Sequence, residues 1–120
     1  MNDQQGLDTI RNYFNDLFGK RNVNALDAYL HPDYFDDDIG DPGIDHIQNS
    51  KEYLTNMFAQ NPTIGVDVKA AIVRDDVISA YLDWHVTENG VKRVIRRGVA
   101  NFVLKQGKII KRHTFVYFEE

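Results

Sequence analysis

Cysteine is absent from the 120-residue chain, which excludes disulfide bonds, thiol nucleophiles and thiolate metal ligands. No apolar run approaches the ~18 residues that a membrane-spanning helix requires, and residues 1–5 have neither the basic nor the apolar segment of a signal peptide. Positive charge is in the minority, because 14 Lys and Arg are set against 18 Asp and Glu, whereas nucleic-acid-binding domains usually carry a basic patch. We therefore expect a cytoplasmic protein with no membrane or nucleic-acid partner.

The residues that are present suffice for one packed core. Apolar and aromatic residues make up 42% of the chain, with seven Phe and six Tyr among them, and a chain of this length supports one hydrophobic core rather than two. No repeat, linker or low-complexity segment divides the sequence. We expect a single domain over residues 1–120.

The first half of the chain has the spacing of amphipathic helices. The expected helices are residues 7–18, 23–30 and 45–60, and stop signals follow them at Gly19, His31-Pro32 and Asn61-Pro62. Residues 33–45 are rich in Asp, Gly and Pro. We expect this segment to be a loop with one short strand near residues 34–39.

The second half alternates apolar and polar residues with period two, as strands do. The expected strands are residues 64–73, 77–87, 91–104 and 108–118. Asn89-Gly90 predicts a type I′ hairpin turn, because both residues tolerate positive φ. Successive hairpins predict an antiparallel meander, and helices followed by strands predict an α+β fold in which three helices cover one face of a curved sheet.

The strand at residues 77–87 has two contrasting faces. One is wholly apolar, and the other carries Tyr81, Asp83 and His85. In one interpretation the apolar face is core and the polar face meets solvent. In the other, the polar face lines a cavity, where Asp83 orients the imidazole of His85 for acid–base chemistry, and the apolar face forms a homodimer, because exposing it to water is costly. We predict the second arrangement, with Ile78, Leu82 and Trp84 on a convex dimer surface.

Several segments, in this order, resemble the nuclear transport factor 2-like superfamily, which includes SnoaL-like polyketide cyclases and ketosteroid isomerases. The resemblance covers about residues 7–118. It implies a cone-shaped sheet wrapped around three helices, with a small-molecule pocket between the helices and the concave sheet face. The segments that carry it are Ile10-Arg11-Asn12-Tyr13-Phe14, Asn22-Val23-Asn24-Ala25-Leu26, His31-Pro32-Asp33-Tyr34, Asp83-Trp84-His85-Val86 and Gly107-Lys108-Ile109-Ile110.

The resemblance also implies roles for single residues, although neither family's catalytic set is complete. Tyr13 stands where the isomerases have the tyrosine that binds an oxyanion, and Asp38 lies near their general base. Ala100 stands where they have a second, protonated aspartate. Arg112 and Thr114 occupy the positions of the cyclases' histidine and aspartate.

Two functions therefore remain open: a cofactor-free acid–base isomerase or cyclase that acts on a small carbonyl compound, or a binding protein for a small apolar or anionic ligand. The candidate catalytic residues are Asp38, His85, Asp83 and Tyr13, and the candidate substrate-binding residues are Arg112, Thr114, Tyr81 and Phe14. We expect no metal, because the acidic run has Gly40 where a calcium-binding loop needs its third ligand. We also expect no cofactor.

Overall fold

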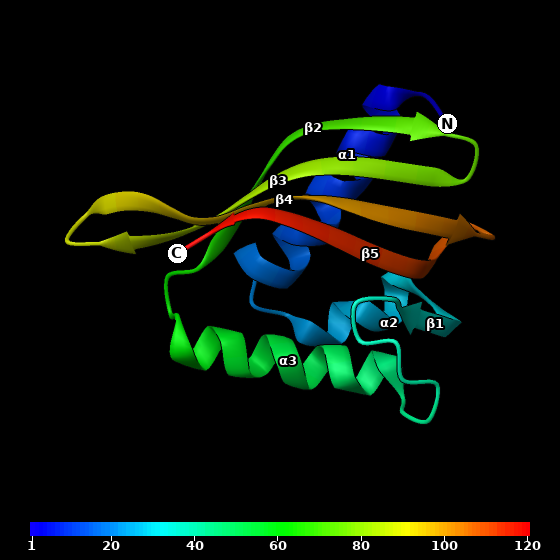
Figure 1. The fold of residues 1–120 in the computed structure, drawn as a ribbon, viewed down its shortest axis with the longest axis horizontal. Helices are drawn as coiled ribbons and strands as arrows, with labels where there is room; N and C mark the ends of the chain where they lie inside the picture. Colours follow the sequence, from blue (N-terminus) through cyan, green and yellow to red (C-terminus); the bar gives the residue numbers. More distant parts are fainter.

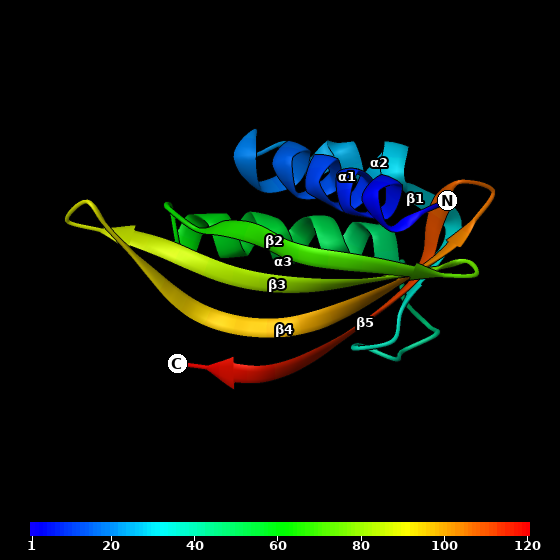
Figure 2. The same cartoon turned by 90° about the horizontal axis from the view of Figure 1, so that it is seen from above.

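All three helices lie on one side of a single curved sheet (Figure 1, Figure 2). The computed structural model describes residues 1–120. None of its helices has the length and apolar character needed to cross a membrane. The elements, in chain order, are α1 (Asp3–Phe14), the π-helical turn η1 (Asn15–Gly19), the 3₁₀ turn η2 (Val23–Ala25), α2 (Leu26–Tyr29), β1 (Leu30–Asp36), α3 (His46–Gln60), β2 (Gly65–Arg74), β3 (Val77–Glu88), β4 (Val91–Lys105) and β5 (Lys108–Glu119).

The two longer helices, α1 and α3, begin where side chains satisfy their free N–H groups. At α1, the Asn2 side chain accepts from the Gln5 N–H and the Gln5 side chain accepts from the Asn2 N–H, both at 2.8 Å. This capping box starts the helix at Asp3, four residues before the predicted position. At α3, Asp45 accepts from the N–H groups of Ile47 and Gln48. The three predicted helices do precede the strands β2 to β5, while β1 lies between α2 and α3.

The sheet has the strand order β1-β5-β4-β3-β2. The predicted antiparallel meander is confirmed for β2 to β5, and Asn89 and Gly90 both have positive φ in the β3–β4 turn. The short fifth strand differs from the prediction: β1 begins at Leu30 and pairs in parallel with β5, which makes the sheet mixed. Pro32 is compatible with this strand because β1 is an edge strand, where a missing N–H has no partner to lose.

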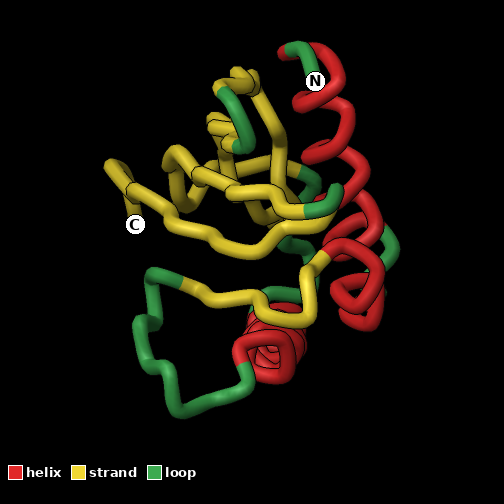
Figure 3. The backbone as a smooth tube through the Cα atoms, turned by 90° about the vertical axis from the view of Figure 1, so that its right-hand side faces the viewer, coloured by secondary structure: helices red, strands yellow, loops and turns green.

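Irregular pairing accompanies the curvature of the sheet over the helices. The register between β4 and β5 shifts at Arg97/Gly98, and such bulges bend a strand and increase its twist. Gly98 is required at this point, because an added Cβ would lie 2.6 Å from the backbone oxygen of Phe115. Figure 3 shows the curved sheet from one end, with helices beside it and below it.

The apolar face of β3 is the inner face of the sheet. Its members are at most 6% exposed within a single chain: Ile78, Ala80, Leu82, Trp84 and Val86. They belong to the same buried cluster as the apolar residues of α1 and η1. The predicted convex dimer surface centred on Ile78, Leu82 and Trp84 is therefore wrong. The physical reason is that the amphipathic helices need an apolar sheet face to cover, and this face is the one available.

Candidate functional site

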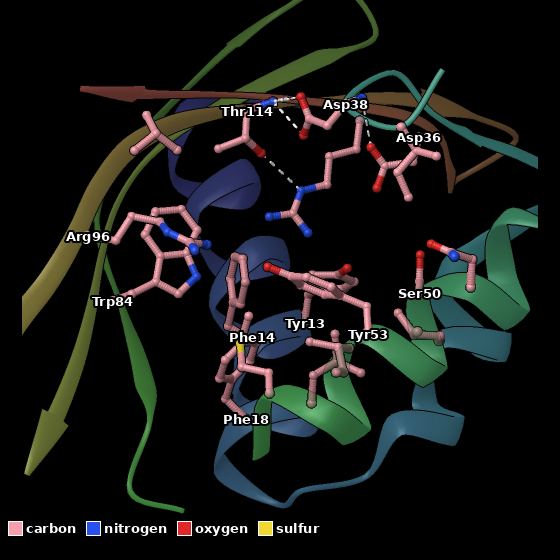
Figure 4. A pocket seen from close by; sticks show the side chains of 18 of the residues that line it. Tyr13, Phe14, Phe18, Asp36, Asp38, Ser50, Tyr53, Trp84, Arg96 and Thr114 are labelled. Atoms are coloured by element: carbon pink, nitrogen blue, oxygen red, sulfur yellow. Dashed lines mark hydrogen bonds between the residues drawn. The ribbon is translucent and has the colours of Figure 1, made fainter. Parts of the chain in front are cut away.

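A cavity of about 410 Å³ lies between the inner sheet face, the α1–η1 helix and α3. Its size is within the range of small-molecule pockets. Hydrophobic residues are the majority of its lining, 12 of 20, so it favours a ligand with an apolar body. Figure 4 shows Phe14, Phe18 and Tyr53 beside this space and Trp84 on the wall of the sheet. The apolar lining includes Phe14, Leu17, Phe18, Leu54, Met57 and Trp84.

Polar groups converge at one end of the cavity, which we call the Arg112 end; it comprises Tyr13, Tyr34, Asp36, Arg112 and Thr114. The Arg112 Nε donates to Thr114 Oγ1 at 3.3 Å, and the terminal nitrogens of the guanidinium lie near the Tyr13 phenol without a hydrogen bond of normal geometry to the protein. Its carbon lies 5.4 Å from the centre of the Phe102 ring. The terminal nitrogens of Arg112 are therefore free to bind an oxygen of a ligand.

Burial sets the protonation of this end. It raises the pKa of the Tyr13 phenol, although Arg112 opposes the shift, and it raises the pKa of Tyr34 strongly. For Arg112, burial alone lowers the pKa, but Tyr13, Tyr34 and Asp36 together outweigh it. The guanidinium stays charged while the phenols stay protonated and able to donate.

Asp36 is the carboxyl group at the Arg112 end whose pKa is shifted. Partial burial raises the pKa of its carboxyl, even though the Asp38 N–H donates to it at 2.9 Å and Arg112 lies near. A carboxyl with a raised pKa exchanges protons closer to neutral pH than an ordinary one does. Asp36 is the last residue of β1 and lies on the same strand face as the buried Tyr34. Both side chains therefore reach the cavity.

Asp38 lies at the rim of the cavity and its oxygens are already engaged. Both accept from the Thr114 N–H at 3.1 Å, and one lies 2.9 Å from His113 Nδ1. Pairing between β1 and β5 ends at Asp36 and Arg112. The Asp38 carboxylate thus accepts a hydrogen bond from a backbone N–H of β5 that has no partner on β1. It stabilises the end of this strand pairing at the mouth of the pocket.

Asp83, His85 and Tyr81 lie on the outer face of the sheet, away from this cavity. Asp83 is 3.3 Å from Arg97 Nε and His85 is 3.3 Å from Asp67, so the expected pair between Asp83 and His85 does not form. Alternation along β3 explains the outcome: since Trp84 faces inward, its two neighbours face outward. Nowhere in the chain do three or more His, Asp or Glu side chains gather as metal ligands would.

The opposite end of the cavity, which we call the Arg96 end, holds a second charged group. Arg96 on β4 donates through Nε to Glu119 Oε2 at 2.6 Å, and its guanidinium carbon lies 5.3 Å from the centre of the Trp84 ring. Figure 4 shows Arg96 and Trp84 together on the sheet wall, apart from Asp36, Asp38 and Thr114. The cavity therefore has a positive group near each end and an apolar middle.

A SnoaL-like domain model matches residues 10–112. The chain belongs to the SnoaL-like family. Its fold is similar to a putative polyketide cyclase from Acidithiobacillus ferrooxidans, at 17% identity and TM-score 0.70 over 90% of this chain and 84% of that one. It is also similar to wild-type IdmH, a putative polyketide cyclase from Streptomyces antibioticus, at 17% identity and TM-score 0.71 over 94% and 92% of the chains. No curated protein matches in sequence.

The comparisons confirm the predicted family and the α+β fold of this SnoaL-like protein. Of the candidate site residues, the cavity brings together Tyr13, Phe14, Asp38, Arg112 and Thr114.

Sequence reasoning missed Asp36, Tyr34, Arg96 and Glu119, which also line the cavity of this SnoaL-like chain. A signal for two of them existed, because Tyr34 and Asp36 are two positions apart and therefore share a strand face. Interpreting residues 33–45 as a loop concealed it. For Arg96 and Glu119, no local pattern distinguishes them from other charged strand residues.

Proposed function

We propose that this SnoaL-like protein binds a small cyclic or aromatic carbonyl compound and moves a proton on the carbon next to the carbonyl, without a cofactor. The observation that carries the proposal is the convergence of Arg112, Tyr13 and Asp36 at one end of a mostly apolar cavity. A cation and a neutral phenol stabilise negative charge on oxygen, and a carboxylate with a raised pKa accepts a proton.

In this mechanism the carbonyl oxygen accepts hydrogen bonds from a terminal nitrogen of Arg112 and from the Tyr13 hydroxyl. The Asp36 carboxylate removes the adjacent C–H proton, and the electron pair moves onto the oxygen as an enolate. Protonated Asp36 then returns the proton to carbon, at the same or at a conjugated position. Thr114 holds Arg112 through Nε. Asp83 and His85 take no part, because they lie on the outer face.

The test is deuterium exchange of 1-tetralone in D₂O, followed by proton NMR. We expect the protein to accelerate loss of the signal from the CH₂ next to the carbonyl in proportion to its concentration. Binding of the ketone without any acceleration would contradict catalysis and would favour the alternative function, a binding protein for apolar or anionic ligands.

Assembly is a second proposal, since three aromatic side chains are exposed on the outer sheet face. Tyr81, Phe115 and Tyr117 are 38–59% exposed, and the Tyr81 and Tyr117 hydroxyls hydrogen-bond to each other. Aromatic residues are enriched in protein interfaces. We propose that this face forms a homodimer, in place of the apolar face of Ile78, Leu82 and Trp84 that the sequence-based prediction assigned to a convex dimer surface.

Sedimentation velocity tests the homodimer. We expect a dimer at micromolar concentration and a monomer for Phe115→Glu. Val91→Glu is the matched control, because Val91 is also exposed, at 66% against 59% for Phe115, and lies at the end of the β3–β4 hairpin; it should leave the dimer intact. A monomeric wild-type protein would rule the interface out.

A further inference from the structure

The Arg96 end of the cavity has no part in the proton transfer proposed above. Arg96 Nε is occupied by Glu119, and the guanidinium makes no other hydrogen bond within the protein. Its position over the Trp84 ring restrains the side chain against the sheet wall. A fixed, charged guanidinium with free terminal nitrogens matches the planar geometry of a carboxylate, which it can bind through two parallel hydrogen bonds.

Glu119 marks the kind of group that fits this position. Its carboxylate contacts only Nε of Arg96, and its side chain is more than half exposed, so the ion pair is weak and easily exchanged. Both Glu119 and Arg96 line the cavity. A carboxylate arriving from inside the cavity would reach the terminal nitrogens that Glu119 leaves open.

We infer that the Arg96 end is a carboxylate subsite and that the pocket takes a keto acid. The carbonyl of the keto acid lies at the Arg112 end, its rings lie along Trp84, and its carboxylate binds Arg96 and displaces Glu119. Glu119 thus acts as a weak internal competitor for anionic ligands. The inference rests on the proposed function only for the placement of the carbonyl at the Arg112 end. Binding of a carboxylate at the Arg96 end does not depend on catalysis.

The sheet register sets the length of this ligand. Arg96 lies opposite Glu119, and Phe102, six residues further along β4, lies opposite Arg112. Six residues of strand span about 20 Å, and the two arginine side chains extend into the cavity from both positions. We infer that a ligand reaching both guanidinium groups has a body of about two rings rather than that of a single small ketone.

Calorimetric titration with 4′-acetylbiphenyl-4-carboxylate and its methyl ester tests the subsite. The acid carries the carboxylate and the ester presents the same body without charge. We expect the acid to bind about 10-fold more tightly, as a charge-assisted bidentate contact would give. Arg96→Gln should reduce the affinity for the acid to that for the ester, and Glu119→Gln should tighten binding of the acid several-fold while the ester is unaffected.

Arg93→Gln is the matched control, because Arg93 lies on β4 like Arg96 and pairs with Glu88 and Glu120 but does not line the cavity. It should leave both affinities unchanged. Equal binding of acid and ester to the wild type, or weaker binding of the acid to Glu119→Gln, would overturn the carboxylate subsite. Deuterium exchange of 1-tetralone is measured separately. If the acid binds more tightly than the ester but the ketone does not exchange, only the proposed catalysis is contradicted. If the ketone exchanges but the acid and the ester bind equally, only the carboxylate subsite is contradicted.

Discussion

Replacing Asp36 by asparagine is expected to slow proton exchange on a bound ketone by about 10²–10⁴-fold, the usual contribution of a general base. Asparagine has nearly the same shape, and its side-chain oxygen can still accept from the Asp38 N–H that Asp36 now binds. Only the ability to take up a proton is removed. The rate is measured by deuterium incorporation at saturating ketone, so that a change in binding does not enter.

The same substitution is expected to increase the free energy of unfolding at neutral pH. Burial raises the pKa of Asp36 in the folded protein, so folding favours the protonated carboxyl. That contribution is complete below the unfolded value of ~3.9 and is lost as the pH rises through the folded pKa. At neutral pH the wild type therefore holds a charge that the fold disfavours, and asparagine removes it.

Urea unfolding at pH 7 and at pH 4 measures this difference. The stability gain of Asp36→Asn should be larger at pH 7. Asp37→Asn is the control, because Asp37 is exposed and its nearest charge is Lys111 at 3.7 Å; it should retain exchange and change stability little. Full exchange activity in Asp36→Asn would remove Asp36 from the mechanism.

Ile78→Ala is expected to destabilise the protein by about 2–5 kcal/mol, the range for deleting a large buried side chain. Ile78 is fully buried on the inner face of β3, close to Gly6 of α1. Ile72→Ala is the matched comparison: Ile72 lies on the neighbouring strand and is 62% exposed, so its loss should stay within about 0.5 kcal/mol.

The two isoleucine variants test which face of the sheet is the core. Two results would support the convex dimer surface predicted from the sequence. One is an equal loss of stability in the two variants, and the other is dissociation of a dimer by Ile78→Ala without a loss of monomer stability. Denaturant unfolding followed by circular dichroism measures the stability, and sedimentation of the same samples reports the association state.

Helices and hairpin strands were predictable because their signals are local. The helical spacing around Ile10 and Phe14, the cap at Asp45 and the turn at Asn89-Gly90 each act within a few residues of the chain. Strand β1 was not predictable in the same way, because its parallel pairing with β5 joins residues such as Asp36 and Arg112 that are far apart in sequence. Pro32 also resembles a helix stop followed by a loop.

The site was only partly predictable for a related reason. Alternation shows that Trp84 and His85 face opposite sides of the sheet, but it cannot show which side the helices cover. The resemblance correctly directed attention to Tyr13, Arg112 and Thr114, which share the cavity. It directed attention to Asp38 rather than Asp36. The aspartates of this run differ in burial and in hydrogen-bond partners only after the fold brings the end of β1 beside β5, so the sequence alone does not distinguish them.

The most direct test of the account is an NMR titration of the Asp36 side-chain carboxyl in the wild-type protein. Asp36 lines the pocket, and burial raises the pKa of its carboxyl. We predict a midpoint above the ~3.9 of an unperturbed aspartate, with the resonance responding when 1-tetralone is added. A midpoint at or below that reference, with no response to the ketone, would contradict the assignment of Asp36 as the acid–base group of the pocket.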